Sequence, residues 1–314
     1  MTTIRPFEPA DLEPVVALLK KTLFADPIPG DVFERKVLLD PNFDPNGALV
    51  AVEGGEPVGF ILGITRKFPI EDQIPDFDRS WITLIAVDPP HQRNGIGMEL
   101  LRRIEPYLKE KGSANVWVSP YAPNYFTPGV DMNAYPEAVE FFRKNGFTEV
   151  YRPLSMDASL PVLRTPEWVS AKEIVLNEEG VLVEPFNPSH ILPLLGFVKA
   201  EFPGDWQRYV RETMSRIASG KDPSNSLWVA VEKGRVLGFA QHEGERFGPF
   251  GVAVKERGRG IGAVLLFKCL HAMRDLGLHG AWFMWTDDKT AKLYQQAGFM
   301  ESRRYVVMRK ALVS

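Results

Sequence analysis

The feature that most constrains the fold of this chain is an internal duplication. Residues Arg5–Pro9 align with Glu184–Pro188 at an offset of 179 residues. The offset falls by 14, to 165, between Gly95 and Gly260, and by a further 13 at a later Gly-Phe pair. A duplicated supersecondary order of this kind predicts one module used twice, with lengthened loops in the first copy. The length of 314 residues fits two such modules.

Each copy contains a buried strand, a glycine-rich turn and an amphipathic helix in direct succession. The strands are expected at Ile82–Val87 and Phe250–Val254. Glycines let the backbone approach a ligand, and the first helical turn presents N–H groups that have no intrahelical partner and favour an anion. Both turns are therefore predicted to bind a pyrophosphate. The predicted binding residues are Gln92, Arg93, Asn94, Gly95, Ile96 and Gly97 in the first copy, and Arg257, Gly258, Arg259, Gly260, Ile261, Gly262 and Ala263 in the second.

The remaining pattern predicts the same order of elements in both halves. A hairpin is expected at 48–65 and again at 227–242, and a helix at 137–144 and again at 289–296. The last strand of the second module is expected at 304–309. These elements predict a first domain over 1–157, a linker over 158–180 containing a short helix, and a second domain over 181–314.

Composition excludes several functional classes. The net charge is −3, so no overall basic field indicates a nucleic-acid partner. The single cysteine, Cys269, lies on the apolar face of a predicted helix, and the histidines show no metal-ligand spacing, so neither a disulfide framework nor a metal site is expected. No apolar run approaches the roughly 20 residues of a membrane span, and the N-terminus lacks a signal-peptide core. We expect a cytoplasmic protein without membrane association.

The two turns share the pattern Gln/Arg-x-x-Gly-x-Gly, and a valine stands eight residues before the central glycine in each, Val87 and Val252. In this pattern the chain resembles the GNAT (Gcn5-related) N-acyltransferases, in tandem. The resemblance implies an α+β class: two copies of a three-layer α/β/α fold, each a mixed, mostly antiparallel sheet flanked by helices. It also implies acetyl-CoA as the acyl donor, with the pantetheine arm inserted where the fourth and fifth strands splay apart.

By the resemblance, the backbone of the fourth strand binds pantetheine and polarises the thioester carbonyl. The matching positions are Phe250, Val252 and Val254 in the second copy and Ile85 and Val87 in the first. A tyrosine four residues before a Gly-Phe pair protonates the leaving thiolate in many members; here it is Tyr294, whereas the first copy has Phe142, which has no proton to give. This difference favours catalysis in the second module.

The sequence leaves open which residue acts as the general base. The position where the family often has a glutamate holds Arg246 in the second copy and Trp81 in the first. Glu243 and Glu245 on the nearby hairpin are candidates, and so are Asp287 and Asp288.

Other interpretations remain beside this one. The string from Gly258 to Ala263 also fits a dinucleotide fingerprint, but about 50 residues follow it, too few for a doubly wound sheet. An insertion in the first copy contains Tyr121, Tyr125, Tyr135 and Asp131, so the first module could instead be catalytic or bind a larger ligand, or the insertion could be a lid.

We therefore predict transfer of an acetyl group from acetyl-CoA to a primary amine of a small molecule, by direct attack in a ternary complex. A non-catalytic acyl-CoA sensor or partner module is the alternative of a different class. The identity of the amine, the acyl chain length and a monomeric or homodimeric state are left open.

Overall fold

The computed structural model describes residues 2–70 and 76–312, which form two compact units. The first unit contains the described residues up to Pro69, those from Asp76 to Pro153, and those from Arg304 onward. The second unit contains Leu154–Arg303 together with Ile70. The proline-rich and acidic composition of Phe68–Arg79 predicts a loop, and residues 71–75 of that segment lie outside the described residues.

The sheet of the first unit has the strand order β1-β2-β3-β4-β5-β14. Its neighbours pair antiparallel except β4 and β5, which pair parallel. Two short strands, β6 and β7, also pair with β14. The strands are β1 (Thr3–Pro6), β2 (Ala48–Glu53), β3 (Glu56–Thr65), β4 (Arg79–Val87), β5 (Asn115–Val118), β6 (Val130–Asp131), β7 (Thr148–Tyr151) and β14 (Met300–Ala311), of which the part after Arg303 belongs here.

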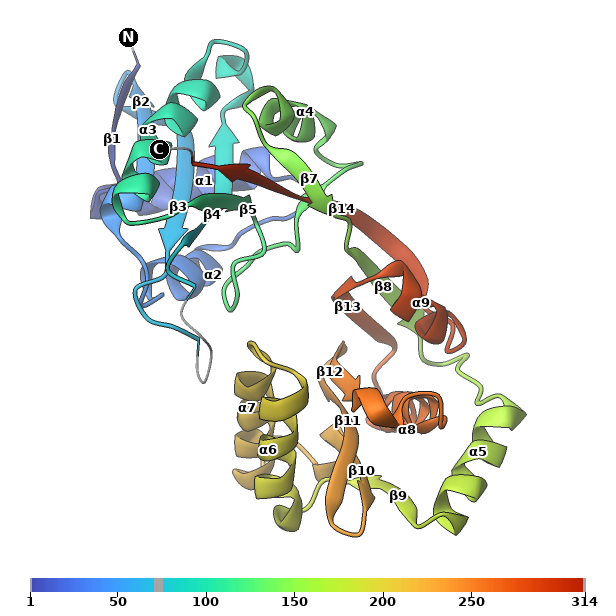
Figure 1. The fold of residues 1–314 in the computed structure, drawn as a ribbon. Helices are drawn as coiled ribbons and strands as arrows, with labels where there is room; N and C mark the ends of the chain where they lie inside the picture. Colours follow the sequence, from blue (N-terminus) through green and yellow to red (C-terminus); the bar gives the residue numbers. More distant parts are fainter. Residues whose placement is uncertain (1, 71–75, 313–314) are drawn as a thin grey trace. The chain divides into compact units, whose positions relative to one another are not determined.

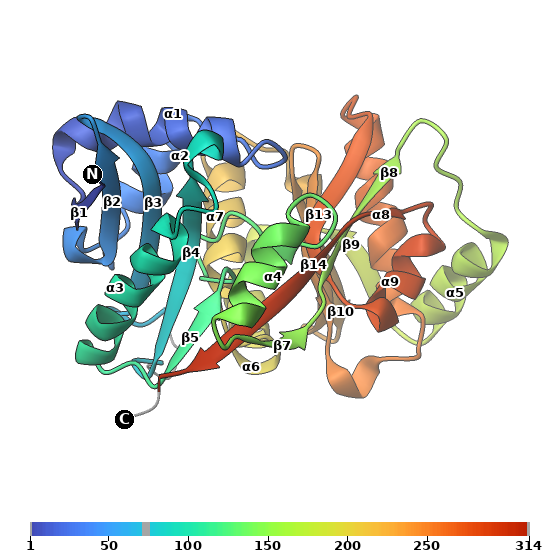
Figure 2. The same ribbon diagram turned by 90° about the horizontal axis from the view of Figure 1, so that it is seen from above.

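Helices cover both faces of this sheet (Figures 1 and 2). One face packs against α1 (Leu12–Thr22) and α2 (Gly30–Phe33), which continues as a π-helical turn over Glu34–Leu38. The other face packs against α3 (Ile96–Glu110) and α4 (Pro136–Lys144). Two separate apolar cores result, one on each side of the sheet, and they give the three-layer arrangement.

The second unit repeats the arrangement, with the strand order β8-β13-β12-β11-β10-β9. The helices α6 and α7 pack on one face, whereas α8, α9 and the connecting helix α5 contribute to the core on the other. The strands are β8 (Leu154–Ser159), β9 (Val181–Pro185), β10 (Leu227–Glu232), β11 (Arg235–Glu243), β12 (Arg246–Val252) and β13 (Gly280–Thr286). The helices are α5 (Glu167–Glu178), α6 (Ile191–Glu201), α7 (Trp206–Ala218), α8 (Ile261–Asp275) and α9 (Asp288–Gln295). No helix in the described chain has both the length and the apolar character needed to cross a membrane.

The compact units do not follow the two sequence repeats at their last strands. Residues 308–311 of β14 pair with β5 in the first unit, and β8 pairs with β13 in the second. The side chains of Met308 and Val306 are fully buried in the first unit's core, and those of Leu154 and Met156 are buried in the second's. The division into 1–157, 158–180 and 181–314 therefore differs from the units at both strands. A duplicated module has the same open position beside its fifth strand, so the equivalent strand of either copy can fill it.

Candidate active site

Both glycine-rich turns have the predicted local geometry. Gly95 precedes α3 with φ +81°, and Gly260 precedes α8 with φ +95°. Only glycine adopts this backbone conformation without steric cost, so these two positions need it. Upstream, the Gln92 Nε2 donates a hydrogen bond to the Val87 carbonyl at 3.0 Å. In the second unit the Arg257 Nε donates to the matching carbonyl, that of Val252, at 3.2 Å.

The fourth strand of each unit parts from the fifth before it reaches the turn. In the first unit β4 and β5 pair only from Arg79 to Ile82 along β4. The amide of Asp88 donates to the Val58 carbonyl on β3 at 2.9 Å. Alternation along an antiparallel pair then directs the backbone groups of Ile85 and Val87 away from β3, into the gap. The register of β11 and β12, with the Ala253 amide bonded to Leu237, directs Phe250 and Val252 in the same way.

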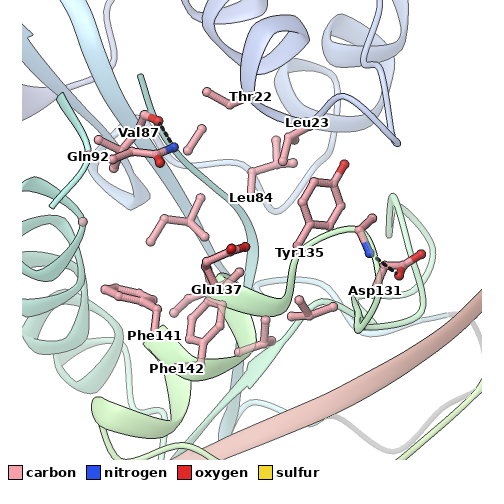
Figure 3. Close-up of a pocket in the computed structure, with 18 of the residues that line it drawn as sticks. Thr22, Leu23, Leu84, Val87, Gln92, Asp131, Tyr135, Glu137, Phe141 and Phe142 are labelled. Atoms are coloured by element: carbon pink, nitrogen blue, oxygen red, sulfur yellow. Dashed lines mark hydrogen bonds between the residues drawn. The ribbon is translucent and has the colours of Figure 1, made fainter. Parts of the chain in front are cut away.

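In the first unit this gap is a cavity of about 1220 Å³. Its walls are β4, the glycine-rich turn, the segment after α1, the insertion that follows β5, and α4. Figure 3 shows the side chains that α4 contributes, including Phe141, Phe142 and Glu137, facing Leu84 of β4. The volume lies somewhat above the roughly 300–1,000 Å³ that is typical of small-molecule and cofactor sites.

The insertion is held in place by a buried polar network. The hydroxyl of Tyr121 donates to the Asp40 carboxylate at 3.0 Å and accepts from the Asn42 amide at 2.8 Å. Asn124 donates to the other oxygen of Asp40 at 2.6 Å. Burial and the neighbouring Asp40 carboxylate raise the pKa of Tyr121 far above its ordinary value. Among the tyrosines of the insertion, Tyr121 is thus a fixed anchor within the core.

Tyr135 has a different setting, because it lines the cavity. Its hydroxyl oxygen accepts a hydrogen bond from the Ala25 amide at 3.0 Å, and its ring packs against Phe24 with centroids 5.3 Å apart. Figure 3 shows the ring standing between the segment after α1 and the insertion. Tyr125, by contrast, contacts Lys36 through its backbone carbonyl and is not among the lining residues.

Aromatic rings fill the corresponding gap in the second unit. Tyr294 is 7% exposed, and its ring centroid lies 4.4 Å from that of Phe283 on β13. Its ring also contacts those of Phe247 and Phe250 from β12 and Phe299. Burial raises the pKa of the Tyr294 hydroxyl well above its ordinary value. The proposed acid of the second module thus lies inside an apolar cluster.

The other predicted residues of the second module have local structural partners. Glu245 accepts hydrogen bonds from the amides of His279 and Gly280, at 3.1 and 2.9 Å, and thereby joins the β11–β12 turn to the start of β13. Glu243 lies 3.3 Å from Arg216, and Val254 lies beyond β12 in a 3₁₀ turn.

The connecting helix α5 covers the second glycine-rich turn. A Cβ atom added to Gly260 would lie 3.1 Å from the side chain of Lys172, whereas one added to Gly95 would meet nothing within 4 Å. Arg259 of this turn is paired with Glu179 at 2.8 Å and with Glu256 at 2.6 Å. Within residues 2–70 and 76–312, Arg93 of the first turn forms no such ion pair. The two turns therefore differ in access and in available charge.

Comparison with known proteins agrees with this geometry. The profile of the acetyltransferase (GNAT) family matches the chain twice, over residues 19–147 and 193–299. The chain belongs to the acetyltransferase (GNAT) family. It is a GNAT-type N-acetyltransferase with two tandem modules of α+β class, as the resemblance of its glycine-rich turns to this family predicted.

Solved structures share this tandem fold at low sequence identity. A fungal multi-domain GH3 β-N-acetylglucosaminidase, described as containing a GCN5-related glucosamine N-acetyltransferase region, matches with a TM-score of 0.77 and 21% identity. The match covers 98% of this chain but 38% of the fungal protein. A GCN5-related N-acetyltransferase from Sphaerobacter thermophilus matches with a TM-score of 0.72 and 20% identity, covering 100% of this chain and 96% of that one. A tandem GNAT protein of the clavulanic acid pathway has a TM-score of 0.61 and 14% identity, with 100% and 99% covered. No curated protein sequence matches the chain.

Sequence reasoning missed several residues that line the cavity. Thr22, Leu23 and Asp26 after α1, Thr83 on β4 and Glu137 on α4 belong to this group. Their segments were predicted, but nothing local in the sequence indicates that the ends of α1 and α4 converge on one strand. A signal was present for Glu137 alone, since it is a charged residue in the first turn of a predicted helix.

Proposed function

We propose that the chain transfers an acetyl group from acetyl-CoA to a primary amine of a small molecule, and that the reaction takes place in the cavity of the first unit. The observation that carries the proposal is the continuity of this cavity with an uncovered glycine-rich turn and with the gap-facing backbone of Ile85 and Val87.

The donor would lie along β4. The first turn of α3, preceded by Gly95, offers unpaired N–H groups to the pyrophosphate, and Arg93 adds a positive charge. The amides of Ile85 and Val87 are placed to hold pantetheine and to donate to the thioester carbonyl oxygen as it becomes negative. Loss of one such donor costs about 3–4 kcal/mol of transition-state stabilisation in other enzymes.

The chemistry is a direct displacement in a ternary complex. The neutral amine nitrogen forms a bond to the thioester carbon, the C–S bond breaks, and the thiolate of CoA takes up a proton. Tyr135 is our candidate for the proton donor, because its ring lines the cavity. The hydrogen bond from the Ala25 amide to the tyrosine oxygen helps to hold the side chain in this position.

The sequence argument favours the second module, with Tyr294 as acid and Glu243 or Glu245 as base. The geometry supports the first module better, because Tyr294 is enclosed by phenylalanines and α5 lies over the turn at Gly260. The second module is then a structural copy. The second unit still has the hydrogen bond from Arg257 to the Val252 carbonyl that matches the one in the first turn. A rival proposal is therefore that the second unit is a further acyl-CoA site, which binds the donor without turnover.

Calorimetric titration of acetyl-CoA into matched variants tests the assignment. Gly95→Glu and Gly260→Glu place the same carboxylate at equivalent, positive-φ positions, so the backbone cost is similar in both. We expect one binding site in the wild type, lost with Gly95→Glu and kept with Gly260→Glu, and thiol release from acetyl-CoA with an amine panel should follow the same pattern. Arg93→Glu, at an exposed position, provides a second variant if Gly95→Glu does not fold.

The reverse result would contradict the proposal. Loss of binding with Gly260→Glu alone would return the reaction to the Tyr294 module, and Tyr294→Phe would then be the variant that abolishes turnover. Tight binding by the wild type without thiol release from any amine would favour the sensor.

A further inference from the structure

The cavity of the first unit has an unequal distribution of charge along its length. Cationic lining residues lie near the glycine-rich turn, with Arg93 in the turn itself and Lys144 in the last turn of α4. The first turn of α4 instead carries Glu137. Seven residues separate the two ends of this helix, about 10 Å along its axis at 1.5 Å per residue. The end away from the pyrophosphate turn is therefore the anionic one.

Glu137 is the carboxylate at this end that is aimed into the cavity. Figure 3 shows it extending from α4 toward the middle of the cavity, between Phe141 and Tyr135. Within the described chain, no hydrogen-bond donor or cation is paired with it.

The other carboxylates of the cavity have structural partners. Asp131 is 4% exposed and accepts the amides of Asn133 and Ala134 at 2.8 and 2.9 Å, so it fixes the insertion. Glu140, one turn after Glu137 on the same helix, pairs with Arg143 at 2.5 Å. The charged groups that line the cavity around Glu137 are Lys21, Asp26, Arg93, Asp131, Glu140 and Lys144. Of these, Lys21 is paired with Asp88.

A second polar group on the opposite wall has no partner. The hydroxyl of Thr83, at the bulge of β4, is buried and forms no hydrogen bond with any described residue. Thr83 lines the same cavity as Glu137. Buried hydroxyls are almost always hydrogen-bonded in folded proteins, so this one is available to water or to a polar ligand atom in the cavity.

From these groups we propose that the acceptor is a cationic aliphatic amine and that Glu137 binds its ammonium group and removes one proton from it. This inference rests on the proposed function, because it places the acceptor in the first unit's cavity. The ammonium N–H bond breaks and its proton passes to a Glu137 carboxylate oxygen, leaving the nitrogen lone pair free to attack the thioester carbon. The protonated Glu137 then returns its proton to solvent. The Thr83 hydroxyl is placed to hydrogen-bond a polar atom of the same amine.

The test compares Glu137→Gln with Glu13→Gln, the same change in the first turn of α1, where the carboxylate does not line the cavity. Two probe amines are used with acetyl-CoA: an aliphatic amine that is protonated at pH 7, and trifluoroethylamine, which is largely neutral there. We expect Glu137→Gln to lower kcat/KM for the protonated amine by at least 100-fold, within the range of general-base contributions. The loss for the neutral amine should be less than 10-fold, and Glu13→Gln should resemble the wild type with both.

The pH profile separates this role from a merely structural one. The loss of kcat/KM in Glu137→Gln should shrink as the pH rises toward the pKa of the aliphatic amine, because more of the amine is then already neutral in solution. An equal loss with both amines at every pH, or no loss with either, would overturn the inference. Calorimetric binding of acetyl-CoA is measured in parallel and should be unchanged in Glu137→Gln. Failure of the proposed function would look different: acetyl-CoA binding and turnover would survive Gly95→Glu.

Discussion

The last strand of the chain completes the sheet of the first unit, so damage to it should unfold the N-terminal module first. Met308 is fully buried in the core that contains β5 and α3, and its backbone pairs with Val118 of β5. We predict that Met308→Ala, near the C-terminus, loosens residues nearly 200 positions earlier while leaving the second unit's core intact.

The expected magnitude follows from the burial of this side chain. Replacement of a fully buried methionine by alanine costs about 2–5 kcal/mol, from lost transfer free energy and the cavity left behind. A middle value of about 3 kcal/mol corresponds to a roughly 100-fold increase in the population of the opened first unit. Units of this kind open separately in native-state hydrogen exchange.

Peptide-resolved hydrogen exchange is the assay. Protection should fall in β5 (Asn115–Val118) and β7 (Thr148–Tyr151), which both pair with β14, and stay unchanged in α8. Leu270→Ala is the matched control, since Leu270 is fully buried in the second unit's core and should give the opposite pattern. The reasoning would be refuted if Met308→Ala exposed α8 and β13 and left β5 protected.

Three further predictions concern the network, the covered turn and one ion pair. Tyr121→Phe should lower the free energy of unfolding by about 2–4 kcal/mol in urea titrations, because it leaves a buried carboxylate and a buried amide each short of a partner; a loss below 1 kcal/mol would contradict this anchor. The double variant Lys172→Ala/Glu179→Gln should uncover the second turn, and a second acetyl-CoA site in calorimetry is the expected sign; unchanged stoichiometry would show that α5 is not what closes it. Asp11→Asn should destabilise the chain at pH 7, because the hydrogen-bonded Arg5 guanidinium lowers the pKa of Asp11 below its ordinary 3.8. That contribution is present above the unfolded-state pKa and is lost as pH falls through the lower folded-state pKa, so unfolding midpoints of the two proteins should converge in acid; a gap that does not narrow as the pH falls would refute this origin.

Much of the fold was predictable because its signals are local. A glycine before a helix that needs positive φ, as at Gly95, can be recognised within a few residues. The family, the tandem organisation and the α+β class were predicted from such turns and are confirmed. The site was less accessible to sequence reasoning. Tyr294 stands at the family's acid position, yet only the packing of Phe247, Phe283 and Phe299 around it gives its environment.

The sequence by itself determined that this protein contains one module twice, each with a glycine-rich turn after a buried strand, because spacing and periodicity along the chain suffice for that; the GNAT family followed from the resemblance of these turns to its motif. Only the tertiary structure decided which strand completes which sheet, and which turn the connecting helix covers. The physical reason is that both depend on contacts between residues far apart in sequence: Met308 fits beside β5, and Lys172 lies over Gly260. Because the two modules are copies of one another, β8 and β14 each have a sequence pattern that fits beside either β5 or β13. Packing between residues far apart in the sequence alone decides which strand pairs with which.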